Sequence, residues 1–89
     1  MKIHFPNPSR SYDECKSRVM FWGYDSAIEI SFYVEVDALK QLCPEMGDVE
    51  KSYLRAFDDS REKIHEVADK LYSRGSQGDY AFVLAAKDF

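Results

Sequence analysis

The stretch RVMFWGYDSAIEISFYV, residues 18–34, contains the strongest secondary-structure signal in the chain. Its second part, Ala27–Val34, alternates apolar and polar residues, which is typical of a strand with one buried face. Its first part, Arg18–Gly23, is rich in β-branched and aromatic residues, and a turn signal at 23–26 separates the two. We therefore expect an antiparallel hairpin that points these side chains toward the core: Val19, Phe21, Ile28, Ile30, Phe32 and Val34.

The remaining segments predict helices after the hairpin and one strand near each end. Apolar residues recur at three and four positions in Glu35–Cys43, as on a short helix, and residues 48–73 predict a long helix capped by Asp48. Lys2–Phe5 and Asp79–Ala86 are expected to be strands. The order β-β-β-α-α-β predicts an α+β fold, with an antiparallel sheet of about four strands packed on one short and one long helix. We expect one domain over residues 1–89.

Composition excludes several classes of function. The net charge is −4, and the densest basic cluster is interleaved with acidic residues, so we expect no nucleic-acid partner. No apolar run approaches the roughly 20 residues of a membrane span, and residues 1–10 contain no apolar signal segment. Cys15 and Cys43 are far apart and lack metal-ligand spacing. We expect a cytoplasmic protein with reduced thiols, without metal or cofactor and without membrane contact.

Several motifs of the chain resemble a known family. The segments IHFPN near the start, RVMFWGYDSAIEISFYVEVDAL in the middle and FDDSREKIHEVADKLY in the last helix are similar to a small proteobacterial family, domain of unknown function 1488. The matching positions are Ile3, Phe5, Pro6, Val19, Phe21, Asp37, Ala38, Leu39, Phe57, Arg61 and Ile64. The resemblance extends over nearly the whole chain and implies an α+β fold. It implies no activity and no catalytic residues.

The aromatic residues of the hairpin suggest a contact surface. If Val19 and Phe21 face the core, then Met20 and Trp22 face the opposite side of the sheet, together with Tyr33. Helices are expected to cover only one side of so small a sheet. The surface of Met20, Trp22 and Tyr33 would then be open to a partner, because Trp and Tyr dominate interface hot spots. The alternative is that the final strand or the C-terminal residues 87–89 fold over it.

The helix stretch AFDDSREKI, residues 56–64, places Arg61 beside the apolar stripe, about 40° from Phe57 on a helical projection. Arg61 can cover apolar surface with its aliphatic stem or pair with a carboxylate, for which these residues are candidates: Asp25, Glu29 and Asp58. The functional alternative is an anion site built by Arg61 and His65, one turn apart. A surface position for His65 is the simpler expectation.

Other reactive side chains give weaker signals. Lys16 and Arg18 flank Cys15, which makes it the more reactive thiol, whereas Cys43 is expected in the core. Asp58, Asp59 and Glu62 are expected on a solvated helix face, and they lack the pattern of a calcium loop.

We therefore expect a non-enzymatic interaction or regulatory module that self-associates through the aromatic sheet face or a sheet edge, or that binds an unknown protein. The alternative function is binding or conversion of a small anionic ligand by Arg61 and His65.

Overall fold

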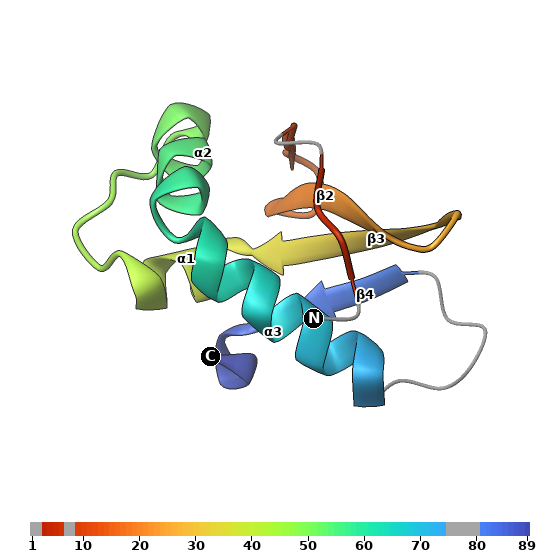
Figure 1. Cartoon of the computed structure of the whole chain (residues 1–89). Helices are drawn as coiled ribbons and strands as arrows, with labels where there is room; N and C mark the ends of the chain where they lie inside the picture. Colours follow the sequence, from red (N-terminus) through yellow and green to blue (C-terminus); the bar gives the residue numbers. More distant parts are fainter. Residues whose placement is uncertain (1–2, 7–8, 75–80) are drawn as a thin grey trace.

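The computed structural model describes residues 3–6, 9–74 and 81–89. Their elements follow the chain in this order: β1 (Ser11–Asp13), β2 (Arg18–Asp25), β3 (Ile28–Glu35), α1 (Val36–Leu42), α2 (Glu50–Asp59), α3 (Arg61–Arg74), β4 (Ala81–Leu84) and the short 3-10 helix η1 (Ala86–Asp88). The four strands form one sheet in the order β1-β2-β3-β4 (Figure 1). The predicted α+β class with about four strands is confirmed.

The central hairpin forms as its alternation predicts. β2 and β3 are antiparallel with Phe21 opposite Phe32, and Ser26 in the connecting turn adopts a left-handed backbone with φ 57°. Five of the six predicted inward side chains are buried. The sixth, Ile28, is 48% exposed because it lies at the tip of the hairpin, next to the turn.

The strands outside the hairpin differ from expectation. β4 pairs with β3 in parallel, so the sheet is mixed and not wholly antiparallel. A parallel neighbour requires a long crossover, and here the three helices supply it. The described part of the expected strand Lys2–Phe5 contributes one bridge, between His4 and Tyr24, since Pro6 cannot donate to a ladder. The edge strand is instead β1, a segment for which no strand was predicted.

The expected long helix is two helices. α2 ends at Asp59, Ser60 adopts φ −113° and ψ 17°, and α3 begins at Arg61. The Ser60 N–H still donates to the carbonyls of Ala56 and Phe57, and the Ser60 carbonyl accepts from the N–H of Ile64 at 3.0 Å. Because the chain changes direction at Ser60, both helices can bury their apolar stripes. Phe57 of α2 and Ile64 of α3 are each 0% exposed.

The N-terminal segment packs on the same side of the sheet as the helices. A Cβ at Gly23 of β2 would lie 2.5 Å from Ile3 Cγ2 and 2.8 Å from the ring of Phe5, so only glycine admits these two side chains. The Ile3 N–H donates to Asp69 of α3 at 2.9 Å. Residues far apart in sequence thus join one core.

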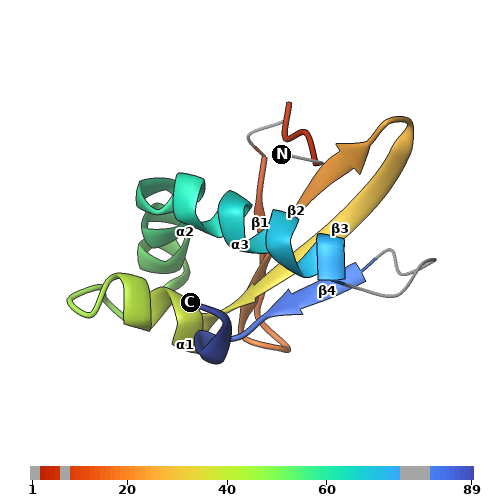
Figure 2. The ribbon, with the colours of Figure 1, turned by 60° about the horizontal axis from the view of Figure 1, so that its bottom comes forward.

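The helices lie on one side of the sheet (Figures 1 and 2). We call this side, which contains Phe21 and Phe32, the inner face, and the opposite side the outer face. Among the described residues, no helix covers the outer face. None of the described helices is both long enough and apolar enough to cross a membrane.

Candidate functional site

The outer face gathers the predicted contact residues on adjacent strands. Met20 lies opposite Tyr33, and Trp22 lies opposite Ser31. Val83 of β4 pairs with Tyr33 and is 45% exposed. Met20, Trp22 and Tyr33 are each half-buried. We call these neighbouring positions, Met20, Trp22, Tyr33 and Val83, the apolar centre, because they share one face of adjacent strands, where side chains lie within reach of one another.

The C-terminal residues do not cover this centre. β4 extends the sheet beside β3, and η1 contacts α1. Phe89 packs against the buried core, and its carbonyl accepts from Gln41 of α1 at 3.4 Å. The alternative expected from the sequence, a C-terminal lid over Trp22, is therefore not formed by residues 81–89.

A shallow depression on the outer face lies beside the indole of Trp22. Its volume is about 220 Å³, and we call it the Trp22 depression; it is lined by Met20, Trp22, Glu29 and Ser31. The O–H of Tyr24 donates to Oε1 of Glu29 over a long distance of 3.5 Å. One side of the depression is formed by Met20 and Trp22 of β2, and the other side by Glu29 and Ser31 of β3.

Arg18 occupies a different part of the outer face. Its guanidinium lies 3.9 Å from the centre of the Tyr33 ring, and its Nε is 3.5 Å from a carboxylate oxygen of Asp13. The side chain is 19% exposed, and its Nε is buried without a hydrogen bond to the described residues. Arg18 is therefore held flat on the sheet by a ring and a nearby carboxylate.

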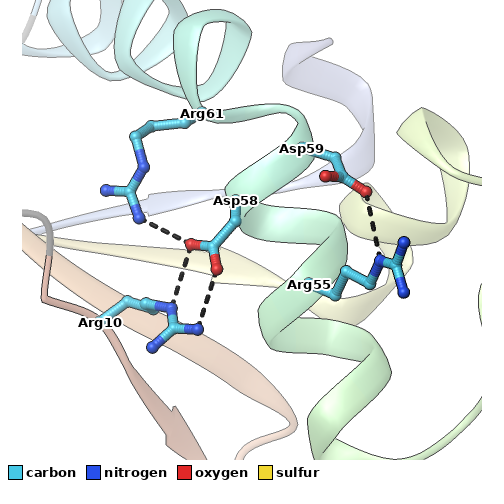
Figure 3. Close-up of polar contacts among 5 residues, drawn as sticks. All are labelled: Arg10, Arg55, Asp58, Asp59 and Arg61. Atoms are coloured by element: carbon cyan, nitrogen blue, oxygen red, sulfur yellow. Dashed lines mark hydrogen bonds and ion pairs between the residues drawn. The ribbon is translucent and has the colours of Figure 1, made fainter.

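Arg61 is held by an ion pair. Its Nη2 lies 2.7 Å from Asp58, one of the three carboxylates considered from the sequence, and the guanidinium carbon is 4.9 Å from the Phe57 ring. Arg10 binds the same Asp58 carboxylate through two nitrogens, at 3.1 and 2.9 Å (Figure 3). Sequence reasoning missed Arg10, since no local pattern links it to a residue 48 positions away.

His65 lies beneath the N-terminal segment. Its ring stacks on Phe5 with centroids 3.9 Å apart and an angle of 7° between the planes. Burial, helped by the nearby charge of Arg61, lowers the pKa of His65 to about 4. The expected solvated position is therefore wrong in part: His65 is half-buried and neutral near pH 7.

The hollow that borders Arg61 does not include His65. The open hollow that includes Arg61 is lined by Asp58, Asp59, Ser60, Arg61, Glu62 and Lys63. The guanidinium already bonds a carboxylate, and the imidazole packs on rings. An anion site at these two residues stays a prediction, and the geometry adds no argument for it.

The remaining candidates lie apart from one another. Cys15 is exposed, whereas Cys43 is half-buried with Sγ 3.6 Å from the hydroxyl of Ser60. Cys43 borders an open hollow of about 660 Å³ between α2 and the preceding loop. Asp58 and Asp59 point to different arginines, and Asp59 is 3.9 Å from Arg55 (Figure 3). No three metal-ligand side chains converge within residues 3–6, 9–74 and 81–89.

The fold and the open outer face define a class: a small α+β protein with a four-stranded mixed sheet whose helices cover one side. The family model described as "Protein of unknown function (DUF1488)" matches residues 3–84, and the chain belongs to this family. The resemblance seen in the sequence is thus confirmed. The chain is similar to the crystal structure of a protein of unknown function from the same family from Shewanella loihica PV-4. That similarity has a TM-score of 0.75, 24% identity and coverage of 90% of each chain, and it shows the shared fold. No curated protein matches.

Proposed function

We propose that the chain is a non-enzymatic protein-interaction module that binds a second copy of itself through the outer face. The observation that supports this most is the apolar centre of Met20, Trp22, Tyr33 and Val83, which no described helix covers and in which Arg18 contacts the Tyr33 ring. Large aromatic side chains on a face with no helix over it cost solubility, and such surfaces mark contact sites. Cytoplasmic location belongs to the same proposal, and the two free thiols are compatible with it.

The size of the outer face sets the expected strength of association. With strand rises of about 3.3 Å and spacings of about 4.8 Å, the sheet measures roughly 25 by 15–20 Å, or about 400–500 Å² in each copy. Two copies would bury about 800–1,000 Å², which is at the lower limit of specific interfaces. We therefore propose a weak, reversible dimer whose population depends on concentration.

Self-association can be tested by light scattering and Trp22 fluorescence from about 1 μM to about 1 mM, the range of weak interfaces. Trp22 is the only tryptophan, so its emission reports on this face alone. We expect the mass to halve on dilution while the emission shifts to longer wavelength.

Two variants make the experiment specific. Met20→Glu should be monomeric throughout and retains the Trp22 signal. Val49→Glu is the matched control, since Val49 is an apolar side chain that is 60% exposed and precedes α2, away from the sheet face. A wild-type chain that stays monomeric at the highest concentration, or equal effects of the two variants, would refute the proposal.

A further inference from the structure

The Trp22 depression is smaller than typical small-molecule pockets. Its volume of about 220 Å³ is below the roughly 300–1,000 Å³ of ligand pockets, and it is shallow. It can accept a single side chain. Trp22 and Met20 form the apolar wall, whereas the wall on β3 is formed by Glu29 and Ser31, whose side chains contain a carboxylate and a hydroxyl. A side chain that matches both walls has an apolar stem and a cationic end that donates hydrogen bonds.

We infer that the Trp22 depression binds a lysine or arginine side chain from a basic segment of a partner protein. The stem of such a side chain packs on the indole and the thioether, as long cationic side chains do on apolar surface. The cation lies at the face of the indole, the strongest aromatic partner for a cation, within reach of the Glu29 carboxylate.

The outer face contains an internal example of this chemistry. The guanidinium of Arg18 lies over the Tyr33 ring, with the Asp13 carboxylate beside it. Trp22 and Glu29 are diagonal neighbours on β2 and β3 and repeat the combination of ring and carboxylate. No cation from the described residues lies over the indole. The outer face thus contains a second combination of ring and carboxylate, and a cation from a partner protein would occupy it.

Charge indicates that this partner is not a second copy. Arg18 is the basic residue of the described outer face, and it is already engaged by Tyr33 and Asp13. Glu29 and Glu35 lie on the outer face of β3, and the whole chain has a net charge of −4. A basic partner complements this charge. It would compete with the weak dimer, so the inference goes beyond the proposed function and does not require it.

The inference can be tested on the full chain at a concentration where it is monomeric. The probe is a capped tri-arginine peptide, and the matched control peptide contains citrulline, which has nearly the same shape without the charge. We expect saturable changes in Trp22 fluorescence with tri-arginine and none with the citrulline peptide.

Two carboxylate variants locate the binding site. Glu29→Gln should weaken tri-arginine binding about tenfold, which is the scale of a lost charge-assisted contact. Glu35→Gln removes a charge from the same face of the same strand, outside the depression, and should change binding less than twofold. Circular dichroism of both variants controls for folding.

Three results would overturn the inference. Absence of tri-arginine binding would do so and would leave self-association untouched. Equal weakening by Glu29→Gln and Glu35→Gln would show diffuse attraction to an acidic surface. Loss of self-association in both Arg18→Gln and Glu29→Gln, without peptide binding, would assign the depression to Arg18 of a second copy.

Discussion

The two faces of the sheet are built from the same strands and have different surroundings. On the inner face, Phe21 and Phe32 are at most 2% exposed and their rings lie 5.3 Å apart. On the outer face, Met20 and Tyr33, each adjacent in sequence to one of these phenylalanines, are half-buried with no helix over them. Both faces contain aromatic residues, but the fully buried rings lie on the inner face. The outer aromatic side chains therefore require another explanation, and binding a partner is the one proposed here.

The largest difference between the faces should appear in stability. Phe32→Ala removes a fully buried ring that packs on Phe5, Phe21 and Phe82, and it should lower the free energy of unfolding by about 3–5 kcal/mol. Tyr33→Ala, one residue further on the outer face, should cost about 1 kcal/mol or less. Urea denaturation measures both. Similar losses for the two variants would mean that the outer face also belongs to the core.

The second prediction concerns the close approach of the N-terminal segment to the inner face. Gly23→Ala places a methyl group against Ile3 and Phe5 and should destabilise the chain by about 1–3 kcal/mol, as overpacking does. Hydrogen exchange at the amides of His4 and Tyr24, which bond each other's carbonyls, should accelerate. Ser31→Ala, a small change on the outer face, is the control. Unchanged exchange in Gly23→Ala would show that the segment does not depend on this contact.

The third prediction sharpens the comparison through pH. His65 has a folded pKa of about 4, lowered by burial and by Arg61, against a usual value of about 6.5. The unfolded chain therefore binds the proton more readily. The contribution of neutral His65 to the free energy of unfolding is fully present above about pH 6.5 and decreases as the pH falls toward 4. Below pH 4 this group causes no further decrease.

Because His65 is only half-buried, solvent screens its charge, and we expect the free energy of unfolding to decrease by about 1 kcal/mol between pH 7 and pH 4.5. Urea midpoints at pH 7 and pH 4.5 measure it. In His65→Gln the decrease should shrink by that amount, whereas His4→Gln, at an exposed position, should retain it. A decrease of the same size in both variants would assign the pH dependence to other groups.

The smallest predicted effect lies at the surface, away from both faces. Asp58→Asn removes the carboxylate shared by Arg10 and Arg61 and should cost about 0.5–1 kcal/mol, less at high salt. Asp59→Asn is the matched control, because its contact with Arg55 is long at 3.9 Å and both side chains are well exposed. It should have almost no effect on the urea midpoint. Equal costs for the two variants would contradict a specific role for the Asp58 cluster.

Local patterns predicted the parts of the fold that depend on local physics. Alternation in Ala27–Val34 identified the central hairpin, and helical spacing located the apolar stripe that Phe57 and Ile64 bury. The break at Ser60 was not apparent, because a single serine inside a helical pattern is tolerated. β1 was missed because an edge strand of three polar or aromatic residues has almost no pattern to detect.

Contacts between distant segments could not be derived from the sequence. Nothing local specifies that β4 runs parallel to β3, since strand direction depends on the path of the intervening helices. The pair of Arg61 with Asp58 was among the expected ones because it is three residues apart on the chain. Arg10, 48 residues from Asp58, joins only through the tertiary fold. The predicted outer residues Met20, Trp22 and Tyr33 do share one face. Val83 lies beside Tyr33 because β4 pairs with β3, which the sequence did not indicate.

The parallel pairing of β4 has a kinetic consequence. β2 and β3 are joined by a short turn, and hairpins of this kind form in about 1–10 μs. Leu84 of β4 pairs with Val34 of β3, and all three helices lie between them in the sequence. β4 can therefore join the sheet only after this intervening chain has brought it back to β3. Closing so long a loop costs entropy before any contact repays it. We therefore expect the hairpin to be formed early and β4 to dock late, so that Leu84→Ala accelerates unfolding in stopped-flow experiments and leaves the folding rate nearly unchanged.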